Sequence, residues 1–168
     1  MRRYLFIAAI LLTVAPLLAA DVGKRHREAV GKFSFCPPQG WTMQNIPGMK
    51  YSIAAGPAAN RFAPNINVVD ENSRMTLNDY VETNKKMLAK AFKGYKELGK
   101  SEFKTTSGLK ATRLVTQSDQ EGTMVRQTFY FFAAKGDRKV TATCSALASG
   151  GKALDEVFEA SLKTFAIE

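Results

Sequence analysis

The side chains most often used in catalysis are sparse in this sequence. The chain contains one histidine, His26, which lies in a basic and polar segment. A His-dependent catalytic triad needs neighbours that hold the imidazole rigidly, and a closed zinc site needs four ligands at short, regular spacing. We therefore expect His26 to be a solvated side chain, and we expect neither a catalytic residue nor a metal ligand.

Acidic residues occur in close pairs, each with an ordinary structural explanation. Paired carboxylates can bind Ca²⁺ or act as general acid and base. Two of these pairs, however, fall in the first turns of expected helices, where they favour the helix dipole, and a third flanks an expected hairpin turn. The sequence also lacks a G-x-S-x-G nucleophile motif and a phosphate-binding glycine loop. We predict a non-enzymatic protein without a cofactor. The pairs are Asp70/Glu71, Asp79/Glu82, Asp119/Glu121 and Asp155/Glu156.

Two cysteines, Cys36 and Cys144, lie far apart in the sequence. In an exported protein an even number of cysteines favours a disulfide over free thiols. Closing so long a loop stabilises a fold by up to about 4–5 kcal/mol in the chain-entropy model. We predict a disulfide between them. The alternative is a pair of buried thiols that pack as small apolar side chains.

A lysine-rich stripe is one candidate partner-binding surface. Lys85, Lys86, Lys90 and Lys93 fall on one side of a helix expected over residues 76–93. Such a stripe can attract an acidic partner or an anionic surface, or it can simply be the solvated face of the helix. Nucleic acid is not an expected partner, because the lysines lack the interleaved aromatic residues of single-strand binders.

Two asparagines form a second candidate surface. Asn65 and Asn67 flank Ile66 in an expected strand over residues 65–70. Asparagine is uncommon in strands, so two on one face can make a polar contact surface. The competing interpretation, which we favour, is that they protect an exposed sheet edge from pairing with another chain.

The first 20 residues have the pattern of a cleavable secretion signal. Arg2 and Arg3 precede an apolar run that continues to Ala20, and Asp21 is expected to begin the mature chain. The alternative is a retained membrane anchor, since the run is near the short limit of about 17–25 residues for a spanning helix. We therefore expect an exported protein, periplasmic or extracellular. Cleavage removes both arginines and lowers the formal charge from +9 to +7.

The remaining residues alternate between strand and helix patterns. Residues 21–30 have no period and predict a flexible tail, after which residues 31–168 form one domain. A second helix is expected at about residues 152–165, and the predicted order is ββββαββββα. Short turns make consecutive strands antiparallel, so the class is α+β, an antiparallel sheet flanked by helices. The expected strands cover about residues 33–36, 41–46, 49–55, 65–70, 95–106, 109–117, 123–134 and 139–146.

The ordered motifs resemble those of PsbP-like domains and of the bacterial DcrB-like (DUF1795-type) family. The opening resembles F-x-F-x-x-P-x-G-W, and later segments resemble the N-I-x-V strand motif, the Ser/Thr-Leu-x-x-Tyr entry to the long helix, and the last strand and helix. The resemblance covers about residues 31–166. The segments are Phe33–Trp41, Pro64–Val68, Thr76–Tyr80 and Val140–Cys144, followed by Phe158 and Phe165.

This resemblance implies the fold that PsbP shares with a Ran-binding factor, an α/β/α sandwich around an antiparallel sheet. It also implies protein binding rather than catalysis, since the theme common to these families is docking on a partner. We therefore predict a non-enzymatic envelope protein that binds another protein or an assembly. The alternative is a periplasmic module that binds a small ligand or a metal.

Overall fold

The computed structural model describes residues 20–168, so the predicted signal segment lies outside the described residues except for Ala20. None of the helices in this described part has the length and apolarity that a membrane span requires. The strands are β1 (His26–Glu28), β2 (Phe33–Phe35), β3 (Thr42–Gln44), β4 (Ile53–Ala55), β5 (Asn65–Asn72), β6 (Lys93–Lys104), β7 (Lys110–Gln120), β8 (Thr123–Ala133), β9 (Arg138–Leu147) and β10 (Ala166–Ile167). The helices are α1 (Leu77–Ala91) and α2 (Asp155–Lys163), with a 3₁₀ turn, η1 (Gly151–Leu154), before α2.

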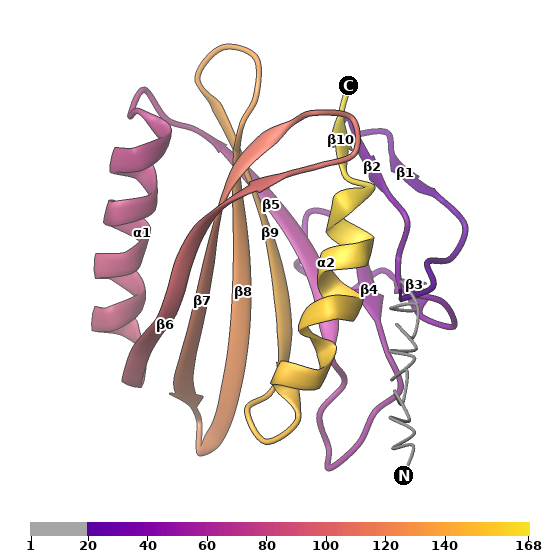
Figure 1. The fold of residues 1–168 in the computed structure, drawn as a ribbon, viewed down its shortest axis with the longest axis vertical. Helices are drawn as coiled ribbons and strands as arrows, with labels where there is room; N and C mark the ends of the chain where they lie inside the picture. The colour runs from indigo at the N-terminus through magenta and orange to yellow at the C-terminus, as the bar shows by residue number, and fades with distance from the viewer. Residues whose placement is uncertain (1–19) are drawn as a thin grey trace, which may run out of the picture.

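The strands form two sheets. A seven-stranded sheet has the order β3-β4-β5-β9-β8-β7-β6, and a three-stranded sheet has the order β1-β2-β10 (Figure 1). Neighbouring strands are antiparallel in both sheets. The α+β class with a large antiparallel sheet and two helices is therefore confirmed.

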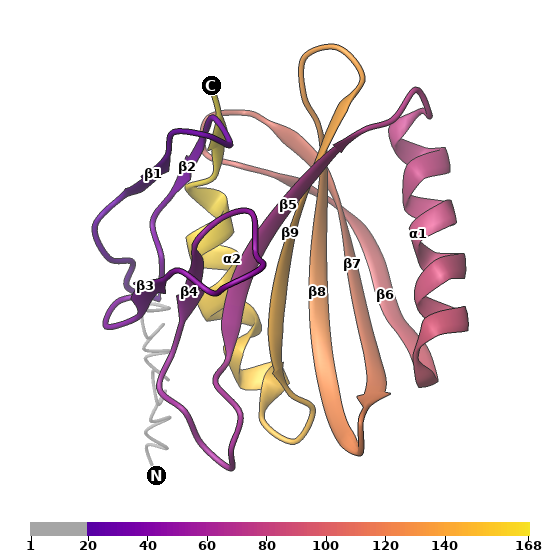
Figure 2. The same cartoon turned by 180° about the vertical axis from the view of Figure 1, so that it is seen from behind.

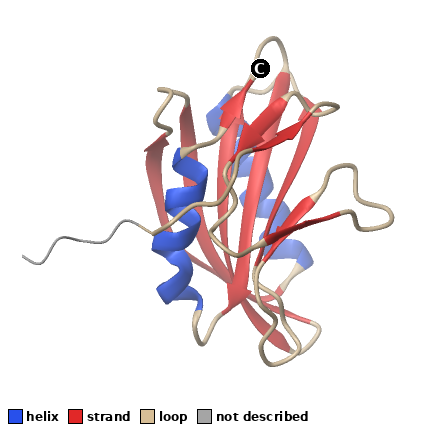
Figure 3. Cartoon of the chain, turned by 90° about the vertical axis from the view of Figure 1, so that its right-hand side faces the viewer, coloured by secondary structure: helices blue, strands red, loops and turns tan. Residues whose placement is uncertain are grey.

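The two helices cover opposite faces of the large sheet, and β8 lies between them. Phe129 and Phe131 on β8 pack with Tyr80 of α1, whereas Tyr130 and Phe132 belong to the core on the side of α2. Successive residues of a strand point to opposite faces, which explains why this stretch of β8 is apolar at every position. Viewed from the side, the strands stand between the two helices (Figure 3).

The helix predicted over residues 76–93 agrees closely with α1. Thr76 caps it, since the Thr76 hydroxyl accepts a hydrogen bond from the Asp79 amide at 3.2 Å and donates to the Asp79 carboxylate at 2.7 Å. The predicted capping box is therefore formed only in part, because the Asp79 carboxylate accepts from the Thr76 hydroxyl and not from the Thr76 backbone amide. On the buried face of the helix, the Tyr80 hydroxyl donates to Glu71 Oε1 at 2.5 Å and so joins α1 to β5.

The predicted strand order is wrong by two strands. β1 lies inside the segment 21–30, for which we expected a tail, and β10 follows the last helix. Both strands pair with β2, with His26 opposite Phe35 and Ala166 opposite Ser34. With three and two residues they are too short to show an alternating pattern, so only tertiary pairing reveals them.

Cys36 and Cys144 are unbonded thiols in the structure, so the disulfide prediction is not confirmed. Cys144 is wholly buried in β9, and burial raises the pKa of its thiol well above the ordinary value. The backbone of Cys36 is held at the end of α2, because its amide donates to Thr164 Oγ1 at 2.7 Å and its carbonyl accepts from the Ser161 hydroxyl at 2.6 Å. Cys144 fits the alternative of a buried thiol that packs as a small side chain, whereas Cys36 is half-buried.

Candidate functional site

Helix α1 covers only part of its face of the large sheet. It contacts mainly β6, β7 and β8. On the same face, no described helix lies over β9 and β5, which face the viewer in Figure 2. The described helices leave this face of β9 and β5 uncovered, although Thr143 and Ser145 on β9 are buried.

The strand register places a set of uncharged polar side chains on this open area. Phe129 points toward α1, and Thr143 lies directly opposite Phe129 and so shares its face. Asn67 in turn lies opposite Thr143, while Ser145 lies between Asn65 and Gln127 in the next row. We call this surface the polar sheet face; it comprises Asn65, Asn67, Gln127, Thr143 and Ser145.

Hydrogen bonds organise one row of the polar sheet face. Gln120 Nε2 donates to Gln127 Oε1 at 2.8 Å, and Gln127 Nε2 donates to Ser145 Oγ at 3.2 Å. Asn65 Nδ2 donates to the Ala63 carbonyl at 3.1 Å. The side-chain amide of Asn67 is half-buried and makes no hydrogen bond within residues 20–168. Side chains of this kind offer donors and acceptors but no ionisable group. The surface is suited to recognition and not to acid–base chemistry.

The interpretation of both asparagines as edge protection is wrong for Asn65. Asn65 pairs with Ala55 of β4 on one side and with Ser145 of β9 on the other, so it lies inside the sheet. Asn67 lies just beyond the last residue pair that joins β4 to β5. The two asparagines lie on the same face of β5, and a contact surface formed by them stays a prediction.

Lys85 differs from the other lysines of the predicted stripe because it forms ion pairs. Its Nζ lies 2.8 Å from Glu97 Oε2 on β6 and 3.3 Å from Glu82 Oε2, and Glu82 also pairs with Lys100 at 2.8 Å. The side chain of Lys85 is only 22% exposed. The hydrogen bond to Glu97 raises the pKa of Lys85, and those from Lys100 and Lys85 lower the pKa of Glu82. This network fastens α1 to β6.

The other three lysines are exposed and form no ion pair within the part of the chain that the structure describes. Lys86 and Lys90 lie one turn apart on α1, and Lys93 begins β6. We call these three the outer lysines. The structure does not bring them together with Asn65 and Asn67, which lie on β5 on the far side of β8 and β9.

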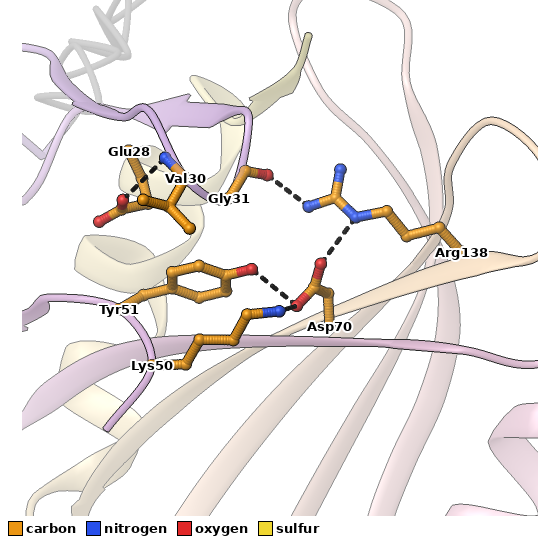
Figure 4. A network of polar contacts seen from close by, with 7 residues as sticks. All are labelled: Glu28, Val30, Gly31, Lys50, Tyr51, Asp70 and Arg138. Carbon is orange, nitrogen blue, oxygen red and sulfur yellow. Dashed lines mark hydrogen bonds and ion pairs between the residues drawn. The ribbon is translucent and has the colours of Figure 1, made fainter. Parts of the chain in front are cut away.

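An ionic cluster that sequence analysis did not predict surrounds Asp70 on β5. Its carboxylate accepts hydrogen bonds from Lys50 Nζ at 2.6 Å, the Tyr51 hydroxyl at 2.7 Å and Arg138 Nε at 2.8 Å (Figure 4). Arg138 also donates to the Gly31 carbonyl. Partial burial alone would raise the pKa of Asp70, but the three hydrogen bonds outweigh it and lower the pKa to about 2. A carboxylate so fully engaged is a structural anion and not a general base.

His26 is not the solvated side chain that we expected. It lies in β1 with its side chain 24% exposed, Nε2 at 3.9 Å from Glu28, and its ring edge-on to Phe35 with the centroids 6.2 Å apart. Its contacts serve the packing of the small sheet. Within residues 20–168, no three His, Cys, Asp or Glu side chains come together as a metal site would require.

No family model and no curated protein matches the chain in sequence. Similar solved structures include the cyanobacterial PsbP (CyanoP) of Synechocystis sp. PCC 6803, with a TM-score of 0.61, 12% identity, and coverage of 94% of this chain and 99% of that one. LpqN of Mycobacterium tuberculosis, described as involved in cell envelope biogenesis, has a TM-score of 0.62, 16% identity and coverage of 88% and 86%. The Ran-binding protein Mog1p of Saccharomyces cerevisiae has a TM-score of 0.59, 10% identity and coverage of 88% and 96%.

At these identities the likeness establishes the fold alone. The chain has the fold that PsbP and Mog1p share, as the resemblance of its motifs implied. Membership of the DcrB-like family stays a prediction.

The Asp70 cluster predicts how stability depends on pH. The pKa of Asp70 is about 2 in the folded protein, whereas the ordinary value is about 3.9. Protonation therefore favours the unfolded chain, and stability that is complete above about pH 5 falls as the pH drops toward about 2. Urea unfolding across this range should show a loss of about 2 kcal/mol attributable to Asp70.

The variant Asp70→Asn should lack this part of the pH dependence and should already be less stable at neutral pH. Asp137→Asn is the matched control, because Asp137 is 59% exposed and lies 3.8 Å from Arg74. An Asp70→Asn protein with the same acid slope as the wild type would contradict the assignment.

Proposed function

We propose that this protein is an exported, non-enzymatic protein that binds a protein partner through the polar sheet face. The observation that carries the proposal is the position of this surface. It lies on central strands of the large sheet, α1 does not cover it, and Asn65, Asn67 and Gln127 are partly exposed there (Figure 2).

The polar sheet face has the properties of a rigid recognition surface. Its residues lie on β5, β8 and β9, whose backbones are paired along most of their length. A partner that binds there meets positions that are already fixed, so little conformational entropy is lost on binding. Amides and hydroxyls supply the direct hydrogen bonds that protein interfaces need, at about one per 100–200 Å².

The outer lysines favour a partner with acidic side chains. Lys86 and Lys90 are exposed on α1 and Lys93 is exposed at the start of β6, and none of the three forms an ion pair among the described residues. Exposed charges of one sign mainly accelerate the encounter with a partner of opposite charge and contribute less to the final affinity. The two surfaces therefore have separate roles, one in contact and one in attraction.

The similar structures support a binding role. Mog1p is described as Ran-binding and LpqN as involved in cell envelope biogenesis. Together with the signal pattern of residues 1–20, this favours an envelope location for the partner. The absence of catalysis is part of the proposal, because Asp70 is fully hydrogen-bonded and the polar sheet face carries no ionisable side chain.

A role in binding a small ligand is the second candidate. The feature that favours it is a hollow of about 480 Å³ at the other end of the sheet, beside β6 and β7. Its lining is charged, unlike the polar sheet face, so the two surfaces suit different binding partners.

The polar sheet face is tested by adding bulk and charge at its centre. Asn67→Arg should reduce capture of the partner from envelope extracts by about tenfold or more, since a long cation then stands on a flat contact surface. Asn72→Arg is the matched control on the same strand, because Asn72 is exposed and lies on the opposite face of β5 from Asn67. Quantitative mass spectrometry of the captured proteins measures the effect. Equal recovery of every protein by both variants would remove this surface from the proposal.

The outer lysines are tested by charge reversal. The triple change of Lys86, Lys90 and Lys93 to Glu should slow association and flatten its dependence on salt, while dissociation changes little. A control with Lys24, Lys135 and Lys152 changed to Glu alters the net charge equally at exposed positions elsewhere. Surface plasmon resonance at several salt concentrations separates the two rates. The same slowing in both triple variants would indicate net charge alone.

Export is tested by the mass of the protein in cell fractions. We expect the periplasmic or secreted form to begin at Asp21, since Ala19 and Ala20 provide the small residues next to the cleaved bond. Alkylation of the unfolded protein in the same experiment reports whether Cys36 and Cys144 are thiols. A membrane-bound form that retains Met1 would instead indicate an anchor.

A further inference from the structure

A charged hollow of about 480 Å³ lies where β6 and β7 approach α2. The β6–β7 hairpin passes beside the C-terminal end of α2 (Figure 1), and Lys163 Nζ donates to the Lys104 carbonyl at 3.1 Å across this junction. The lining includes Phe103 and Arg113 from the sheet and Glu159 and Lys163 from the helix. The hollow is therefore formed where the β6–β7 hairpin and α2 are held together.

Arg113 is the unusual residue of this hollow. Three arginines of the described chain are half-buried, namely Arg113, Arg126 and Arg138. Arg126 forms a two-point contact with Asp155, at 3.1 and 2.6 Å, and Arg138 pairs with Asp70 at 2.8 Å. Arg113 forms no ion pair within residues 20–168; the Tyr130 hydroxyl interacts with its guanidinium, and its buried Nε has no partner. Half-buried guanidinium groups normally pair with a carboxylate, and no described carboxylate pairs with Arg113.

A buried phenol lies beside Arg113. Tyr130 lies directly opposite Arg113 in the sheet, and its wholly buried hydroxyl interacts with the Arg113 guanidinium without a hydrogen bond of ordinary geometry. Its ring packs against Phe103 with the centroids 4.6 Å apart. Burial raises the pKa of Tyr130, so the phenol stays protonated and remains a donor.

The charge of the lining is positive. Lys104, Lys110 and Lys163 join Arg113, and Glu102 and Glu159 are the acidic residues among the lining side chains. Glu159 lies 3.9 Å from Lys163 and forms no ion pair with Arg113. Lys163 Nζ is held 4.7 Å above the ring of Phe103, so this charge is fixed at the site.

We propose that this hollow binds a small oxyanion, a carboxylate or a phosphate group, with the Arg113 guanidinium as its principal ligand and Lys163 as a supporting charge. A guanidinium fork matches two oxygens of either group and makes charge-assisted hydrogen bonds with them. The site lies beside α2, on elements that the polar sheet face does not use, and it does not depend on the proposed partner.

The test is a titration of the mature protein with inorganic phosphate and, separately, with sodium acetate, at constant ionic strength set with sodium chloride. We expect a saturable rise in melting temperature, because a ligand that binds only the folded state stabilises it. In NMR spectra, the Arg113 Nε–H resonance should shift along the same binding curve. A response to phosphate alone assigns a phosphate ligand, and a response to acetate alone assigns a carboxylate.

Arg113→Met should weaken the apparent affinity by about tenfold or more, since it removes the charge-assisted contact but keeps a long side chain. Lys135→Met on the exposed β8–β9 hairpin is the control for loss of one positive charge, and it should keep the wild-type affinity. No saturable response to either anion, or the same response in Arg113→Met as in the wild type, would overturn the proposal.

Glu159→Gln provides an independent test if Arg113→Met does not fold. Removing this carboxylate from the lining should strengthen binding of the responding anion several-fold, because it takes away a competing negative charge. Unchanged or weaker affinity in Glu159→Gln would overturn the proposal as well. Neither outcome bears on partner binding at the polar sheet face, so the two proposals can fail separately.

Discussion

The burial of β8 on both of its faces is the constraint on which the rest of the structure depends. Four consecutive aromatic residues, Phe129 to Phe132, must all leave water, and a strand can bury such a run only between two layers. Phe131 therefore packs on Tyr80 of α1, with ring centroids 6.0 Å apart, and Phe132 packs on Phe165 beyond α2, with centroids 4.8 Å apart. This places one helix on each side of the sheet.

The same constraint decides which surfaces remain open. A helix is about 10–12 Å wide and strands lie about 4.8 Å apart, so α1, which lies over β6, β7 and β8, cannot also shield β9 and β5. The part of that face without a helix carries the half-buried Asn65, Asn67 and Gln127 and the buried Thr143 and Ser145, with Val69 exposed beside them on β5. On the other face, α2 lies nearer the β5 side, and the hollow with Arg113 occupies the space beside it. Both candidate sites are thus consequences of where two helices fit on seven strands.

The features that sequence predicts are those set by local or periodic patterns. Thr76 and Asp79 mark the start of α1 because capping acts over three residues, and the apolar run in β8 identifies a central strand because burial acts on every residue. The features that it misses depend on partners distant in sequence. Asp70 pairs with Arg138, which is 68 residues away in the sequence, and Lys85 pairs with Glu97 on the strand that follows α1. Nothing near Asp70 or Lys85 in the chain indicates which of many charged residues will be the neighbour.

Low sequence identity among similar folds follows from the same division between core and surface. The core requires only apolar side chains of suitable volume at alternating positions, and many sequences satisfy that requirement. Identities of 10–16% with structures that share the fold are therefore compatible with a common core. Residues such as Asn67 and Arg113 do not belong to the apolar core, since one is a half-buried amide and the other a guanidinium without a carboxylate partner among the described residues. Because the core does not explain them, they are the residues from which the specific function of this chain has to be inferred.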